Sequence, residues 1–179
     1  NTTRNRMELV DILRCKRESG PREIVFSKDG KYAYILFELI NKVGVFTYKD
    51  TDKGPEFELI QLVEPLSDQL DPMHDCGAAM TMSPDGKYLF TSTAGDNSVA
   101  MFSINPEDGK LTKEFALPIS GEYPKDIALF PDGKHLASIN HEGSISFFKI
   151  DYEKGLLVMS DRSITVNEPN CCEIVKIGD

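Results

Sequence analysis

Short apolar segments alternate with polar turns along the whole chain. Three stretches of similar design, FSKDGKYAY from Phe26, MSPDGKYLF from Met82 and FPDGKHLA from Phe130, place a glycine-containing turn between two such segments. The segment after each turn shows the period-two alternation that is typical of a β-strand. The sequence therefore predicts the same β-hairpin three times.

The spacing of these hairpins indicates a repeat larger than a hairpin. Their turn glycines, Gly30, Gly86 and Gly133, are 56 and 47 residues apart. A third strand-like segment with an aromatic residue follows each hairpin, namely VGVFTY, VAMFSI and ISFFKI. After a polar connector comes a weaker fourth segment, namely FELIQLV, LTKEFAL and LLVMSDRSI. Each repeat is therefore predicted to be a four-stranded antiparallel meander, over residues 21–63, 74–117 and 121–166.

A twisted four-stranded unit of this kind has two apolar faces. Neighbouring units bury both faces when they stack around a common axis, as the blades of a β-propeller do. The alternative is a β-sandwich of stacked hairpins, but sandwiches do not usually repeat one hairpin signature about every 50 residues. We therefore expect an all-β fold, a partial β-propeller that forms a single domain over residues 1–179.

The two ends of the chain predict an incomplete ring. Residues 7–16 have the pattern of the outer strand of a preceding blade, and residues 168–177 that of the first strand of a following blade. A propeller has roughly four to eight blades and must close, and three full blades do not close. We therefore expect a missing N-terminal half, or other copies of the chain, to cover the open blade edges.

Composition narrows the class of partner. The formal net charge of −9 opposes nucleic-acid binding, and no basic stripe with aromatic residues offsets it. No apolar run approaches the ~20 residues of a membrane-spanning helix. The four cysteines lack CxxC spacing and are expected to be reduced, with the cytoplasm as the default location. Because the chain has no P-loop, GxGxxG, GxSxG or metal-ligand spacing, neither a cofactor nor a metal is expected.

Three longer stretches resemble a known family. They are GPREIVFSKDGKYAYILFEL from Gly20, MSPDGKYLFTSTAGDNSVAMFSI from Met82 and GEYPKDIALFPDGKHLA from Gly121. They resemble the seven-bladed β-propeller lactonase family, which includes 6-phosphogluconolactonases and 3-carboxymuconate cyclases. The resemblance runs in register over nearly the whole chain, and it implies that this chain is the C-terminal half of such a protein.

The resemblance also indicates which polar side chains line the top of the central channel. The family motif GPRH reads GPRE here, which keeps the arginine as Arg22. The strand that ends in NEL in the family ends in FEL here, which keeps the acid as Glu38. The motif PRDF reads PKDI, so that Lys125 keeps the positive charge but not the planar guanidinium.

Other family positions carry different residues. Glu23 stands where the family has the histidine of GPRH, and the motif SNRG reads STAG, with Ala94 in place of the arginine. Removing one positioned donor or base typically costs ~100-fold in rate. These replacements favour a weakened site, and they are the reason to keep a second hypothesis beside an enzyme.

The chemistry of lactone opening assigns roles to the retained residues. Water attack needs a base, a donor where the carbonyl oxygen gains charge, and a group that holds the rest of the substrate. On this basis Glu38 is the candidate base and Arg22 the candidate oxyanion partner, both catalytic, and Lys125 is the candidate substrate-binding residue. A simpler interpretation is that Arg22 only pairs with Glu38 or Glu23, and that Lys125 is a rim charge.

Two functions follow from the sequence. The first is hydrolysis of a sugar lactone such as 6-phosphogluconolactone, or a related muconate-type lactonizing reaction. The alternative is a catalytically degenerate propeller that acts as a ligand- or protein-binding module.

Overall fold

The computed structural model describes residues 7, 9–67 and 75–177 and, for residues 161–163, the backbone alone. Residue 74, the first residue of the second predicted blade, lies outside this range. All regular structure in the described part is β-strand. None of it belongs to a helix long and apolar enough to cross a membrane.

The strands form three sheets of four. The first sheet consists of β1 (Pro21–Phe26), β2 (Tyr32–Phe37), β3 (Lys42–Thr51) and β4 (Gly54–Val63). The second consists of β5 (Cys76–Met82), β6 (Tyr88–Ala94), β7 (Ser98–Ile104) and β8 (Leu111–Pro118). The third consists of β9 (Pro124–Leu129), β10 (His135–Asn140), β11 (Ser144–Asp151) and β12 (Leu156–Thr165).

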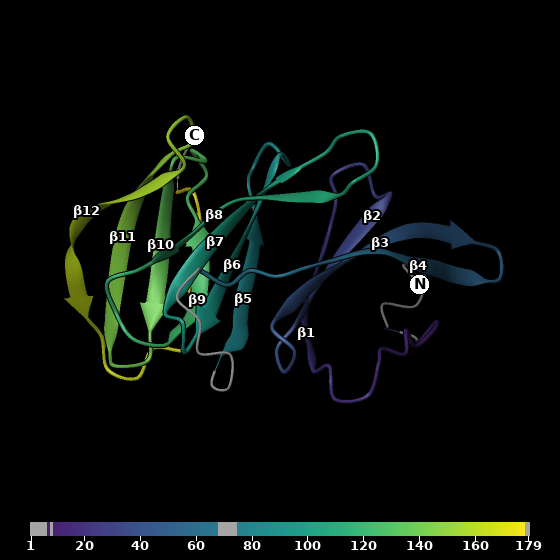
Figure 1. Cartoon of the computed structure of the whole chain (residues 1–179), viewed down its shortest axis with the longest axis horizontal. Helices are drawn as coiled ribbons and strands as arrows, with labels where there is room; N and C mark the ends of the chain where they lie inside the picture. Colours follow the sequence, from purple (N-terminus) through teal and green to yellow (C-terminus); the bar gives the residue numbers. More distant parts are fainter. Residues whose placement is uncertain (1–6, 8, 68–74, 178–179) are drawn as a thin grey trace.

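The three sheets stand side by side (Figure 1). Within each sheet the strands follow chain order and pair antiparallel. The first strands of the sheets touch one another, β1 against β5 and β5 against β9, so they lie nearest a shared hub. This radial arrangement confirms an all-β partial propeller of four-stranded blades, and it differs from a sandwich, in which two sheets face each other.

Each inner hairpin turns at the sequence DGK for a reason that the backbone shows. Gly30, Gly86 and Gly133 have φ of 70°, 76° and 64°, in the left-handed region that glycine adopts without strain. In the middle copy, Gly86 N donates to Ser83 O at 2.8 Å and closes the four-residue turn. The turn is therefore encoded locally, in the residues that the sequence repeats.

Two clusters of buried side chains lie between the sheets. Along β6 and β7, Leu89 and Phe102 pack toward the first sheet, whereas Phe90 and Met101 pack toward the third. All four side chains are at most 1% exposed. Because neighbouring residues of a strand point to opposite faces, the second sheet is apolar on both faces and needs a neighbour on each.

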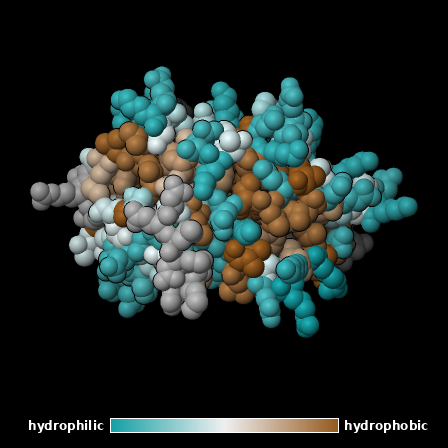
Figure 2. Space-filling view, viewed as in Figure 1, coloured by the Kyte–Doolittle hydropathy of each residue, from teal (hydrophilic) through white to brown (hydrophobic). Residues whose placement is uncertain are grey.

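The first sheet has a second apolar face, which contains no residue of the other two sheets among the described residues. Its buried cluster consists of Ala33, Ile35, Phe37 and Phe46, with Cys15 packed against it. Beside it, Leu59 and Leu62 of β4 are each 48% exposed. Figure 2 shows apolar side chains gathered over this sheet. We call this surface, made of the buried cluster with Leu59 and Leu62, the open face.

The flanking segments differ from the prediction. The described residues of 7–16 form no strand, and neither do residues 168–177. A strand needs a neighbour that completes its ladder of hydrogen bonds, and the described chain offers no such ladder to either segment. The first segment instead reaches the open face through Cys15, and just after it Gly20 O accepts from Glu38 N at 2.7 Å.

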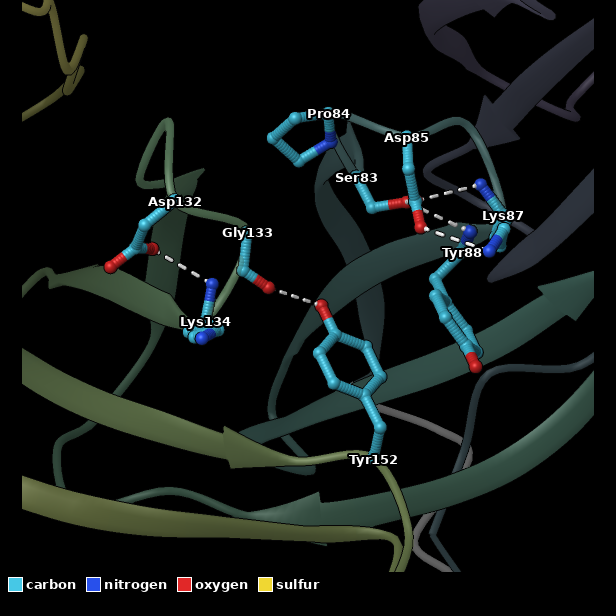
Figure 3. A pocket seen from close by; sticks show the side chains of 9 residues that line it. All are labelled: Ser83, Pro84, Asp85, Lys87, Tyr88, Asp132, Gly133, Lys134 and Tyr152. Atoms are coloured by element: carbon cyan, nitrogen blue, oxygen red, sulfur yellow. Dashed lines mark hydrogen bonds and ion pairs between the residues drawn. The ribbon is translucent and has the colours of Figure 1, made fainter.

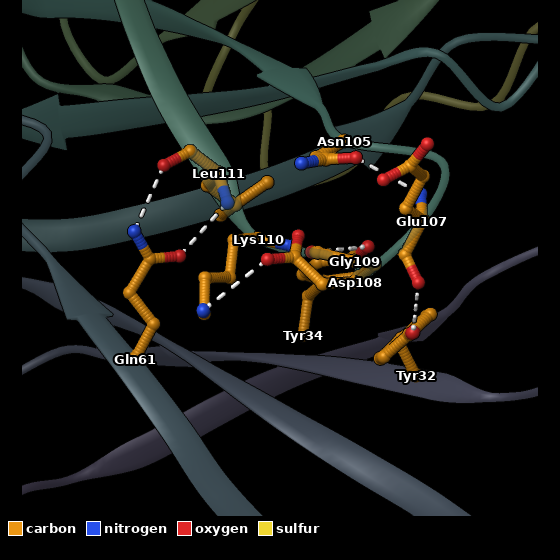
Figure 4. Close-up of polar contacts among 9 residues, drawn as sticks. All are labelled: Tyr32, Tyr34, Gln61, Asn105, Glu107, Asp108, Gly109, Lys110 and Leu111. Atoms are coloured by element: carbon orange, nitrogen blue, oxygen red, sulfur yellow. Dashed lines mark hydrogen bonds and ion pairs between the residues drawn. The ribbon is translucent and has the colours of Figure 1, made fainter.

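The connector between β7 and β8, residues 105–110, helps to join the first two sheets (Figure 4). The buried Tyr34 hydroxyl donates to Gly109 O at 3.0 Å. Gln61 of β4 bonds Leu111 twice, with Nε2 donating to its carbonyl at 2.9 Å and Oε1 accepting from its N–H at 2.8 Å. These polar contacts fix how the second sheet sits on the first, which apolar packing alone does not specify.

Gly109 tests this contact, with Gly30 as its matched control. Both have φ of 70°, but a Cβ at Gly109 would collide with the Tyr32 ring, whereas a Cβ at Gly30 meets nothing within 4 Å. We expect Gly30→Ala to lower the free energy of unfolding by about 1 kcal/mol through backbone strain. Gly109→Ala should cost about 1–3 kcal/mol more through overpacking. Urea unfolding of both variants measures the difference, and equal costs would contradict the contact.

Candidate functional site

The inner strand of each sheet starts with the same irregularity. A β-bulge falls at Arg22 in β1, at Ala78 in β5 and at Lys125 in β9. Bulges redirect side chains and are frequent beside active sites. Arg22 and Lys125, two of the three residues chosen from the sequence, therefore hold equivalent positions where the inner strands begin. We call this end of the hub, opposite the DGK turns, the hub mouth.

Arg22 reaches from the first sheet toward the second and toward Glu38. Its Nε donates to Ala78 O at 2.6 Å, and its Nη1 lies 3.2 Å from Glu38 Oε2 in an ion pair. The two side chains are 41% and 36% exposed. Glu38 directly follows β2, whose last residue Phe37 pairs with Pro21, so the hairpin itself brings the two charges together.

Glu23 connects the first sheet to the backbone of the second. Its Oε2 accepts a hydrogen bond from Met80 N at 2.6 Å. Burial raises the pKa of this carboxyl above its ordinary value of 4.5, and the charge of Asp126 raises it further. The Met80 N–H and the charge of Arg22 act in the opposite direction but do not outweigh them. Glu23 and Asp126 therefore lie within electrostatic range of each other across the hub.

Lys125 and Asp126 repeat this arrangement on the third sheet. Lys125 Nζ donates to Asn170 Oδ1 at 2.9 Å, and Asp126 Oδ2 accepts from Cys172 N at 2.7 Å. Both partners belong to the segment that follows the third sheet. The structure thus brings Arg22 and Glu38 into direct contact, whereas the recorded contact of Lys125 is with Asn170.

The two charged pairs bind their neighbours in the same register. In each pair the cation contacts one residue of the following segment, and the carboxylate accepts from the N–H two residues further on. We call Arg22–Glu23 and Lys125–Asp126 the bulge clamps. By this equivalence, residues 170–172 lie beside β9 in the same way as residues 78–80 lie beside β1. Residues 168–177, predicted to be the next inner strand, therefore occupy the position of an inner strand beside β9 without forming a strand.

The sequence does not predict that the carboxylates of the bulge clamps join one segment to the next. It indicates Glu23 only as the replacement of a histidine and as an alternative ion-pair partner of Arg22, and Asp126 only as part of a motif. The sequence does show that the positions are equivalent, because each stands seven residues before a turn glycine: Glu23, Ala79 and Asp126. What could not be read from the sequence is that their partners lie 57 and 46 residues away.

The second sheet has no charged pair at the equivalent place. Ala78 and Ala79 are 5% and 1% exposed. The sheet is linked to the third by Ser92 Oγ, which donates to Pro124 O at 3.1 Å. Ala94, where the family arginine is lost, is only 1% exposed and therefore packs inside the fold.

Cys171 and Cys172 lie beside Asp126 but are poor nucleophiles. The charge of Asp126, and then a hydrogen bond to it, raise the pKa of the Cys171 thiol. Burial, and then the charge of Asp126, raise that of Cys172. A thiol that stays protonated neither attacks nor binds a metal readily. Among the described residues, no group of three or more His, Cys, Asp or Glu side chains is arranged to hold a metal ion.

A cleft lies at the opposite end of the inner strands (Figure 3). It has a volume of about 380 Å³ and is lined by the DGK turns of the second and third sheets with Tyr88 and Tyr152. The Tyr152 hydroxyl donates to Gly133 O at 2.6 Å, and burial raises its pKa to about 12. Asp85 accepts from Lys87 N within its own turn. These polar groups hold the turns. The hub mouth is the stronger candidate, because Arg22 and Lys125, which the family motifs indicate, lie at the bulges there.

The raised pKa of Glu23 makes stability depend on pH. The folded protein binds this proton more tightly than the unfolded chain, so the free energy of unfolding should fall as pH rises from 4.5 through the folded-state pKa. Glu23→Gln keeps an acceptor for Met80 N but does not titrate. The variant should lose less stability between about pH 4 and pH 7 than the unsubstituted protein. Urea unfolding across this range measures it, and a steeper loss in the variant would refute the assignment.

Comparison with known proteins supports the same fold and register. The model of the lactonase family with a seven-bladed β-propeller matches residues 2–174. The 6-phosphogluconolactonase of Bacillus subtilis is 30% identical over 88% of this chain and 44% of that protein. The one of Formosa agariphila is 32% identical over 90% of this chain and 45% of that protein.

A solved structure gives the same picture. The periplasmic gluconolactonase of Pseudomonas aeruginosa superposes with a TM-score of 0.76, at 25% identity, over 88% of this chain and 43% of that one. This chain thus spans less than half the length of the relatives that it matches. With the family match, the radial sheets and the repeated bulges all in agreement, the chain belongs to the seven-bladed β-propeller lactonase family.

Proposed function

We propose that the protein to which this chain belongs hydrolyses a sugar lactone, or catalyses a related muconate-type lactonizing reaction, at the hub mouth. The observation that carries the proposal is the Arg22–Glu38 pair, a cation and a carboxylate 3.2 Å apart and both more than a third exposed. The family and the names of the relatives, 6-phosphogluconolactonase and gluconolactonase, support the same reaction class. Because the chain spans less than half of those relatives, the rest of the ring is part of this proposal.

In this reaction Glu38 acts as the base. It accepts a proton from a water molecule whose oxygen attacks the lactone carbonyl carbon. Arg22 donates a hydrogen bond to the carbonyl oxygen as negative charge develops there. The ring C–O bond then breaks, and the proton held by Glu38 passes to the leaving oxygen. The product is the open hydroxy acid, and Lys125 holds the substrate beside the reacting bond.

A binding module is the second candidate, and one observation favours it. Both cations of the hub mouth are already engaged by the protein, Arg22 by Ala78 O and Glu38, and Lys125 by Asn170. An engaged arginine is less free to follow a developing charge. In that case the hub mouth binds a sugar acid or lactone without turning it over.

Glu38→Gln separates the two functions. In the full-length protein this change removes the base and keeps the size of the side chain, so the rate of lactone hydrolysis should fall by about 100-fold or more. Glu58→Gln on the outer strand β4 removes the same charge from an exposed position and is the control. Hydrolysis is followed as acid release at constant pH. Unchanged turnover in Glu38→Gln would exclude Glu38 as the base. No turnover in the unsubstituted protein would exclude the enzyme and favour the binding module.

We further propose that the open face is covered in the working protein, by the N-terminal half of the ring or by other copies of the chain. The support is its buried apolar cluster beside the half-exposed Leu59 and Leu62. A β-blade fits this face, because apolar alternation on both faces is how the described sheets pack against each other.

The residues 1–179 expressed alone are therefore expected to associate as concentration rises. Replacing Leu59 and Leu62 together by lysine should shift the protein toward the monomer, because two charges would then need to be buried. Replacing Glu56 and Glu58 of the same strand by lysine is the control and should leave association intact. Sedimentation velocity measures the species present, and a monomer at every concentration would contradict the proposal.

A further inference from the structure

Among the described residues, the hub mouth carries more negative than positive charge. Its described charged groups come from three elements: Arg22 and Glu23 on β1, Glu38 directly after β2, and Lys125 and Asp126 on β9. Two cations therefore meet three carboxylates, and one negative charge is left over. The formal net charge of −9 over the whole chain adds to this field.

The two cations are also committed to protein acceptors. Arg22 lies between Ala78 O, at 2.6 Å from its Nε, and the Glu38 carboxylate. Lys125 donates to Asn170 and is next in sequence to Asp126. A dianionic phosphate would compete with these acceptors for both cations. It would also bring more charge of the same sign toward Glu23 and Asp126.

The titratable groups around Asp126 respond to this excess of negative charge. The pKa of the Cys171 thiol is raised first by the charge of Asp126, with Glu173 and Glu23 adding to it. The charge of Asp126 also contributes to the raised pKa of Glu23, after burial. Both shifts have the direction that nearby negative charge produces, although burial is the larger cause for Glu23.

Carboxylates suit a different ligand. They accept hydrogen bonds from sugar hydroxyls, whereas a phosphate dianion has acceptors only and offers them nothing. Arg22 and Lys125, together with the Asn170 amide, can donate to a lactone carbonyl or a ring hydroxyl. We propose that the hub mouth selects an unphosphorylated sugar lactone over its phosphorylated form. This selectivity narrows the substrate class of the proposed function. As a statement about the reaction it rests on the proposed function, whereas the binding preference does not.

The binding preference is tested with two acids that differ only in the phosphate group. Titration calorimetry of the full-length protein with gluconate and with 6-phosphogluconate, the products of the two lactones, should show gluconate bound about tenfold more tightly. Glu23→Gln removes one negative charge and should improve binding of 6-phosphogluconate about fivefold, which corresponds to about 1 kcal/mol for a unit charge pair at about 4 Å in water. Gluconate affinity should change less.

The control and the hydrolysis assay make every outcome decisive. Glu58→Gln changes the net charge equally but lies on the outer strand, and it should leave both affinities within about twofold. Equal or tighter binding of 6-phosphogluconate, no binding of either acid, or an unchanged ratio in Glu23→Gln would overturn the proposal. If neither lactone is hydrolysed but gluconate is still bound more tightly, the proposed function is wrong and the binding preference stands. If the phosphorylated lactone is hydrolysed faster, the preference is wrong and the proposed function stands.

Discussion

Burial of two apolar faces per sheet is the constraint on which the rest of the structure depends. In β6 and β7, successive residues such as Leu89 and Phe90 must both leave water although they point in opposite directions. Only a neighbour on each side satisfies such a sheet, and a row of such sheets curves around a hub because each sheet is twisted. The same constraint leaves the open face of the first sheet in need of a further blade.

Apolar packing does not by itself fix how far one sheet slides along the next, because it has no direction. The polar contacts between sheets supply that information. At the outer side they are Tyr34 to Gly109 and Gln61 to Leu111, and at the hub they are the clamp of Glu23 to Met80 and the bond of Ser92 to Pro124. Each clamp pairs a carboxylate with a backbone N–H, a contact with both a direction and a charge-assisted strength. These contacts between sheets thus set the register of one blade against the next.

The hub mouth therefore uses the same side chains for structure and for chemistry. Arg22 links two sheets through Ala78 and, in the proposed reaction, faces the substrate beside Glu38. This double use explains why both described cations of the candidate site are bonded to protein acceptors.

The sequence by itself determined the parts of this protein that depend on neighbours along the chain. The DGK turns, the strand alternation and the four-stranded repeat are encoded within about 50 residues, and they are sufficient to predict the fold. The family motifs add the candidate site residues Arg22, Glu38 and Lys125. Only the tertiary structure decided what the bulges do. Glu23 finds its partner on another blade, and Asp126 finds its partner on the segment after the last blade. The described residues of 7–16, and residues 168–177, do not form strands. Such contacts depend on how whole sheets pack, and no local pattern of residues specifies that distance or its register.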